Sequence, residues 1–116
     1  MTQAGRSLFI FGFYPLIMGL LFIAVPGLLV SLLGLPPLVY GWAGVLGLMA
    51  LSIGIYHVTG GARDVLAYID TTIYTRAGFA LGLVMLIVTG QLPPIVLGLA
   101  AIDAIGAFWT WRCLKG

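Results

Sequence analysis

The sequence predicts an all-α integral membrane protein, a four-helix bundle, and three observations support this fold class. Hydrophobic residues make up 62% of the 116 residues and charged residues only 7%, against about 25% charged residues in ordinary soluble domains. No Asp, Glu, Lys or Arg occurs in residues 7–62 or 77–102. These apolar stretches do not alternate with period two, and lipid requires backbone polar groups to be paired internally, so we expect helices.

Proline, glycine and charged positions divide the chain into four runs of the roughly 20 apolar residues that a spanning helix needs. We expect spans over residues 8–25, 37–59, 71–90 and 94–113, which form one domain covering residues 1–116. The connection over residues 26–36 is too short to span and too apolar for an aqueous loop. Residues 28–33 are therefore expected to form a short helix along the outer interface.

The basic residues indicate the orientation of the chain. They occur near the N-terminus, in or near the second connection and near the C-terminus, at Arg6, Arg63, Arg76, Arg112 and Lys115. The other two connections have no charge, so the positive-inside rule predicts that this multi-pass protein has both termini and the middle connection in the cytoplasm. Five aromatic residues are expected to form an interfacial belt on that side: Tyr56, Tyr68, Tyr74, Trp109 and Trp111.

Spans two and four open on similar segments, PPLVYGWAG from Pro36 and PPIVLGLAA from Pro93. The two segments share both prolines, the valine, the glycine and the alanine. An internal repeat of this kind predicts two helical hairpins related by an axis along the membrane normal. Spans one and three match less well, which leaves coincidence as the alternative.

Small residues recur at helical spacing in the spans and predict the faces through which helices pack. Lipid provides no hydrophobic drive for helix association, so small residues that allow close backbone approach mark the contacts. The predicted packing glycines are Gly12 and Gly19 in span one, Gly47 and Gly54 in span two, and Gly78 and Gly82 in span three.

Asp103 lies inside the otherwise apolar run AIDAIGAFWT, on the face that also presents Ala100, Gly106 and Ala107. That face points into the bundle, and an intramembrane aspartate usually has a partner. Arg76 is the expected partner, because the predicted spans place Arg76 roughly 8 Å and Asp103 roughly 14 Å from the cytoplasmic side.

His57 and Tyr14 fall in the same half of the membrane as Asp103 and Arg76. We therefore predict an intramembrane polar cluster of Asp103, Arg76, His57 and Tyr14. The Asp103 and Arg76 pair is either a buried ion pair that fixes helix register or a site for a proton, an ion or a polar head group. His57 is expected to be a hydrogen-bonded residue near the interface.

Residue types exclude several chemistries. With one His, one Cys and no Glu, the chain has too few ligands for a bis-histidine haem, a zinc site or a di-iron carboxylate site. No metal site, no resident cofactor and no catalytic residue is predicted, and the absence of a basic cluster argues against nucleic acid binding.

The chain resembles the broad group of small bacterial four-helix inner-membrane proteins that includes the DoxX-like families. The resemblance depends on the proline-bounded spans, the segment PGLLVSLLGLPP, the arginine early in span three, and DAIGAFWT in span four. It implies a four-helix fold with cytoplasmic termini and, in one branch, association with a quinone-linked oxidoreductase. It implies no catalytic residue.

Two functional hypotheses follow. The first is a structural or accessory subunit without catalysis of its own, which packs in the bilayer with itself or with a larger membrane-protein partner. The alternative is a small-molecule or proton-linked site centred on Asp103 and Arg76, as in a transporter or a redox partner that binds a quinone.

Overall fold

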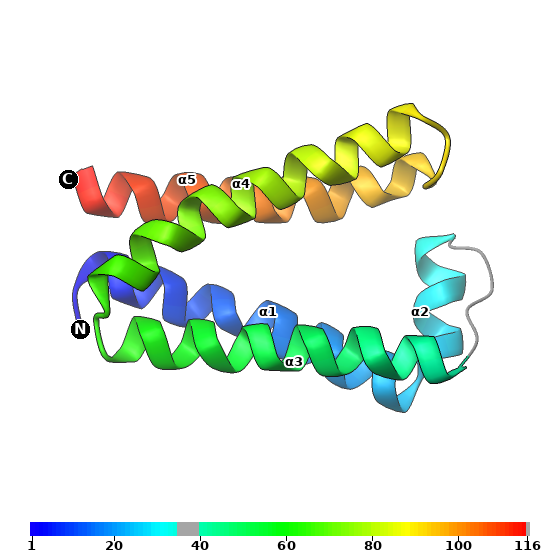
Figure 1. Cartoon of the computed structure of the whole chain (residues 1–116), viewed down its shortest axis with the longest axis horizontal. Coiled ribbons are helices and arrows are strands. Elements are labelled where there is room, and N and C mark those ends of the chain that lie inside the picture. The colour runs from blue at the N-terminus through cyan, green and yellow to red at the C-terminus, as the bar shows by residue number, and fades with distance from the viewer. Residues whose placement is uncertain (35–39, 116) are drawn as a thin grey trace.

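The computed structural model describes residues 1–34 and 40–115, which are helical and contain no strand (Figure 1). In chain order the elements are α1 (Gln3–Ala24), α2 (Pro26–Leu33), α3 (Tyr40–Ala62), α4 (Leu66–Val88), the 3-10 turn η1 (Pro94–Val96) and α5 (Leu97–Lys115). Four helical segments of the described chain are long and apolar enough to cross a membrane. The predicted all-α bundle of a multi-pass membrane protein is confirmed.

Two helices begin before the predicted spans: α1 begins at Gln3 rather than at residue 8, and α4 begins at Leu66 rather than at residue 71. The other described bounds agree with the predicted spans to within about one turn. Hydropathy detects only the apolar part of a helix, whereas α4 also includes the exposed Asp70 in an earlier turn. Residues 35–39 lie outside the described residues. They include the end of the predicted outer connection, the start of the second predicted span and the opening of the first repeat segment.

The short helix predicted between the first two spans is confirmed as α2 (Pro26–Leu33). Pro26 occupies the first turn of α2, where a backbone N–H would have no hydrogen-bond partner within the helix, so proline costs no hydrogen bond there. Gly34 follows the helix with φ of 63°, a left-handed conformation that glycine adopts without a steric penalty. α2 lies across the end of the bundle that is opposite the two termini (Figure 1).

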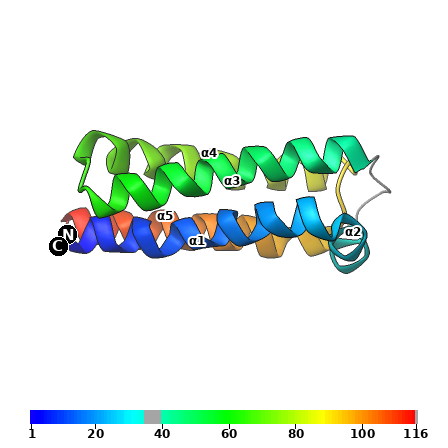
Figure 2. The same ribbon diagram turned by 90° about the horizontal axis from the view of Figure 1, so that it is seen from below.

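The spanning helices form two pairs, α1 with α3 and α4 with α5, and the pairs are joined mainly between α1 and α5. α3 and α4 contact each other only sparsely, although they follow one another in the chain. Figure 2 shows the bundle turned by 90°, with α1 and α5 on one side and α3 and α4 on the other. Both termini lie at the same end of the bundle.

Glycines bring α1 and α3 into close contact, as predicted for four of the six packing positions. A methyl group at Gly19 would lie 2.6 Å from the carbonyl oxygen of Gly47, and one at Gly54 would lie 2.8 Å from the backbone nitrogen of Leu16. Gly12 and Gly47 meet backbone atoms of the opposite helix in the same way. The backbones of α1 and α3 therefore touch along most of their length.

Gly78 and Gly82 pack against no other described helix of this chain, so their predicted packing role stays a prediction. A methyl group at either position would meet no atom within 4 Å, and Gly78 is exposed. The physical reason is that helical spacing shows only that two small residues share a face. It does not show that another helix of the same chain covers that face.

A buried hydrogen bond joins α1 to α5. The hydroxyl oxygens of Ser7 and Thr110 lie 2.8 Å apart, and both residues are fully buried. Ser7 donates its proton to the carbonyl of Ala4 at 2.7 Å, so Thr110 is the donor to Ser7. This bond fixes the register of the two helix pairs near the end of the bundle where the termini lie.

The connection between α3 and α4 also holds the start of α1. Asp64 has φ of 50° and its carboxylate accepts hydrogen bonds from Thr2 N at 2.8 Å and from Thr2 Oγ1 at 2.8 Å. Thr2 Oγ1 in turn accepts from the backbone N–H of Gly5 at 3.0 Å and caps α1. These hydrogen bonds hold the pKa of Asp64 below its ordinary value, because they favour the charged carboxylate.

Four of the five residues predicted for the aromatic belt lie on the outside of the bundle: Tyr56, Tyr74, Trp109 and Trp111. Tyr68 is the exception, since its side chain turns inward and bonds to His57. Many large apolar side chains are exposed on all four spanning helices. Such a surface suits contact with lipid chains.

Candidate functional site

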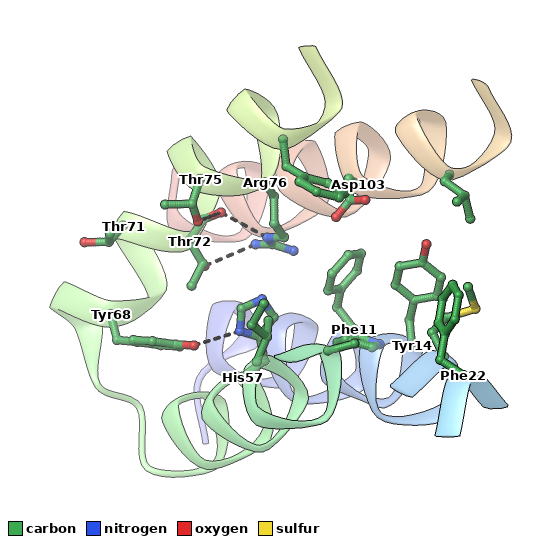
Figure 3. A pocket seen from close by; sticks show the side chains of 16 residues that line it. Phe11, Tyr14, Phe22, His57, Tyr68, Thr71, Thr72, Thr75, Arg76 and Asp103 are labelled. Atoms are coloured by element: carbon green, nitrogen blue, oxygen red, sulfur yellow. Dashed lines mark hydrogen bonds between the residues drawn. The ribbon is translucent and has the colours of Figure 1, made fainter. Parts of the chain in front are cut away.

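The spanning helices enclose a cavity of about 500 Å³ at the centre of the bundle. Its volume lies within the roughly 300–1,000 Å³ of small-molecule sites in proteins. All four residues of the predicted polar cluster, Asp103, Arg76, His57 and Tyr14, line this cavity. Figure 3 shows them converging from α1, α3, α4 and α5.

The cavity opens sideways between α3 and α4. Ile53 on α3, and Thr75 and Phe79 on α4, line the cavity and are also exposed on the outside of the molecule. The opening arises because α3 packs on α1 through glycine and makes few contacts with α4. In a membrane this opening faces lipid.

Polar and apolar residues occupy different ends of the cavity. The polar cluster lies toward the end of the bundle that contains the termini. The other end is lined by apolar side chains from α1, α3, α4 and α5: Met18, Phe22, Ala50, Phe79 and Leu99. The cavity is therefore amphipathic along the bundle axis.

Arg76 is 96% buried, with 4% of its surface exposed. Its Nε donates to the carbonyl oxygen of Thr72 at 3.2 Å, its Nη2 donates to Thr72 Oγ1 at 3.4 Å, and its guanidinium lies 4.7 Å from the centre of the Phe11 ring. Gly106 makes room for this arrangement, since a methyl group there would meet the Phe11 ring and, at 3.2 Å, Arg76 Nη1. Nη1 itself is buried without a hydrogen-bond partner among the described residues.

Asp103 is 6% exposed, and its Oδ2 is also buried without a hydrogen-bond partner among the described residues. The observed helix bounds bring Arg76 and Asp103 to similar depths, about 15 Å and about 18 Å from the ends of α4 and α5 on the terminal side. The carboxylate nevertheless makes no salt bridge to Arg76, whose guanidinium is held by Thr72 and Phe11 (Figure 3). The ion pair expected between them is not formed.

His57 is buried, and its Nδ1 lies 2.8 Å from the hydroxyl oxygen of Tyr68. This contact agrees with the expectation of a hydrogen-bonded histidine. Tyr14, on α1, is half-buried, and its hydroxyl points toward α5, where Asp103 lies (Figure 3). His57 and Tyr14 thus lie on either side of the unpaired groups of Arg76 and Asp103 (Figure 3).

Sequence reasoning missed Phe11, Thr72 and Tyr68 as parts of the site. The sequence does contain a signal that Phe11 and Thr72 belong to the site. Thr72 lies one helical turn before Arg76 and Phe11 lies one turn before Tyr14, so each shares a helix face with a predicted site residue. The position of Tyr68 has no such signal, since an aromatic residue near a membrane interface suits a lipid-facing belt equally well.

No family model, curated protein or solved structure shows a significant match to the chain. The resemblance to the DoxX-like group therefore stays a prediction. The site belongs to the class of membrane-embedded cavities. Among the described residues its wall contains one buried donor, Arg76 Nη1, and one buried acceptor, Asp103 Oδ2, without a hydrogen-bond partner. The size and lining of such a cavity suit a molecule that is soluble in lipid.

Proposed function

We propose that the protein binds a lipid-soluble molecule with a polar head group in the cavity between its four spanning helices. The observation that carries the proposal is the pair of buried, unpaired atoms, Arg76 Nη1 and Asp103 Oδ2, on residues that line one cavity. A buried polar group without a partner costs about 1–3 kcal/mol, and more when it is charged. A molecule that pairs with both atoms removes that cost.

The shape of the cavity supports binding from the bilayer. A molecule that enters between α3 and α4 meets an apolar wall at one end of the cavity and the polar cluster at the other. Its apolar part replaces contact with lipid, while its head group finds hydrogen bonds that lipid chains do not offer. The function proposed is binding, in a transporter, a carrier or the ligand-binding subunit of a larger complex, without catalysis by this chain.

Filling the cavity tests the proposal. Native mass spectrometry of protein purified from membranes in mild detergent should show a retained small molecule. Ala50→Phe, which fills the cavity, should abolish retention, whereas Ala101→Phe, on the exposed surface of α5, should leave it unchanged. Identical spectra for the wild type and Ala50→Phe would refute the proposal.

A quinone, which the DoxX-like resemblance implies, fits the site only in part. Its carbonyl oxygens accept hydrogen bonds and suit Arg76 Nη1, but an oxidised quinone has no donor for Asp103 Oδ2. The reduced quinol has hydroxyl groups and suits both atoms. The unpaired atoms thus favour the reduced form over the oxidised form.

We also propose that the end of the bundle with both termini faces the cytoplasm of a bacterial cell. Arg6, Arg63, Arg112 and Lys115 support this orientation through the positive-inside rule. In a Cys113→Ala background, a membrane-impermeant thiol reagent added to intact spheroplasts should label Gln91→Cys and spare Lys115→Cys. The reverse pattern would show the opposite orientation.

A second candidate function, an accessory subunit, is favoured by the open face of α4. A groove lined by Gly78, Gly82 and Leu86 is not covered by other described helices, and its glycines permit close approach of another helix. In the Cys113→Ala background, Gly82→Cys should form disulfide-linked dimers in membranes if a second copy packs there. Only monomers would exclude self-association through this groove.

A further inference from the structure

We infer that the head group of the bound molecule is electrically neutral and contains a hydroxyl group. The inference rests on the binding function proposed above and concerns the chemistry that the cavity selects. Two observations carry it, the kinds of atom left unpaired in the cavity wall and the balance of charge in that wall.

The unpaired atoms require opposite hydrogen-bonding partners. Arg76 Nη1 is a donor only, and the carboxylate oxygen Asp103 Oδ2 is an acceptor only. A hydroxyl group is the smallest head group that accepts from the first and donates to the second. A carboxylate, a phosphodiester or a ketone has no proton to give to Asp103, and an ammonium group has no lone pair for Arg76.

The charge balance of the cavity points the same way. Besides His57, which is bonded to Tyr68, its wall contains one basic residue, Arg76, and one acidic residue, Asp103, both more than nine-tenths buried. A neutral head group leaves these charges balanced within the membrane. An anionic or cationic head group adds an uncompensated charge to a site remote from water, where such charges are costly.

The surroundings of the two atoms fix the place of the head group. Thr72 accepts hydrogen bonds from the other two guanidinium nitrogens of Arg76, Nε and Nη2, and the Phe11 ring lies against the guanidinium. His57 is already bonded to Tyr68 through Nδ1. The free bonding positions at the polar end therefore include Arg76 Nη1 and Asp103 Oδ2. A hydroxyl between them leaves the rest of the molecule to extend along the apolar end of the cavity.

Four probes that each contain an unbranched sixteen-carbon chain test the inference: hexadecan-1-ol, 4-hexadecylphenol, hexadecanoic acid at neutral pH, and hexadecane. Thermal unfolding of the full chain in mild detergent is measured against the concentration of each probe, and the shift gives a Kd through ligand linkage. The shift measured with Ala50→Phe is subtracted, because this variant experiences the same changes in the micelle without an open cavity. The two hydroxyl probes distinguish an aliphatic from an aromatic head group.

At least one hydroxyl probe should bind the wild type ten-fold or more tightly than the acid and the alkane. In Asp103→Asn no acidic residue of the cavity wall balances the charge of Arg76. This variant should therefore bind hexadecanoic acid more tightly than hexadecan-1-ol, the reverse of the order in the wild type. Circular dichroism and size-exclusion elution establish that this variant is folded; should it fail to fold, the wild-type series decides.

Two results would overturn the inference while leaving the binding function intact. They are tightest binding by the acid in the wild type, and equal binding by all four probes. A wild type that shifts no more than Ala50→Phe with every probe would instead refute the proposed binding function itself.

Discussion

The contact between α1 and α3 predicts that one added methyl group, Gly19→Ala, will destabilise the protein. The new Cβ would lie 2.6 Å from the carbonyl oxygen of Gly47 and 2.7 Å from the backbone nitrogen of Leu51. Restoring an ordinary contact of 3.4 Å needs about 0.8 Å of movement, and both neighbours are backbone atoms that no rotamer change can displace. Overpacking of this kind costs about 1–3 kcal/mol.

Gly78→Ala is the matched control, because Gly78 also lies in the middle of a spanning helix and its added Cβ would meet no atom within 4 Å. Both variants gain the same intrinsic preference of alanine over glycine in a helix, about 0.5–1 kcal/mol. Unfolding in mixed micelles, followed by circular dichroism, should show Gly19→Ala less stable than Gly78→Ala by about 1–3 kcal/mol. Equal stability of the two variants would refute the close approach of α1 and α3.

Two further predictions concern polar contacts near the termini. In a double-mutant cycle with Ser7→Ala and Thr110→Val, the buried hydroxyl pair should give a coupling energy of about 0.6 kcal/mol, as is usual for hydrogen bonds between membrane helices; zero coupling would contradict the bond. Hydrogen bonds from Thr2 lower the pKa of Asp64 on folding. The charged Asp64 carboxylate therefore stabilises the folded protein fully above its unfolded pKa, about pH 4, and this stabilisation is lost as the pH falls through the folded pKa. The melting temperature of the wild type should therefore exceed that of Asp64→Asn at pH 6 and lose this advantage in acid, with Asp70→Asn as the control; an advantage independent of pH would contradict the assignment.

Much of the fold could be predicted because lipid imposes strong constraints on a chain. The long uncharged runs predicted four spanning helices, and PGLLVSLLG, between proline and glycine, predicted the crosswise helix α2. The heptad spacing of Gly12 with Gly19, and of Gly47 with Gly54, predicted faces that do meet. The faces of Gly78 and Gly82 meet no other described helix of this chain, because a small-residue face shows only that close approach is possible.

The site was predicted at the level of its residues and not of its contacts. Helical periodicity correctly directed Asp103 inward, since periodicity gives the angle of a residue around its own helix axis. Depth along the predicted spans brought Arg76 into the same site. It says nothing about side-chain rotamers, and the guanidinium bonds to Thr72 rather than to Asp103. The inward turn of Tyr68 was equally unpredictable, because it depends on how α4 leaves the short connection after α3.

Under the proposed binding function, the sideways opening between α3 and α4 determines whether the concentration in lipid or in water governs occupancy of the cavity. Ile53, Thr75 and Phe79 border that opening from helices that lie within the bilayer. An occupant arriving by this route leaves the lipid phase rather than water, so occupancy depends on its mole fraction among the lipids and on competition from their acyl chains. A change in membrane composition would therefore load or empty the cavity while the aqueous solution on both sides stays the same.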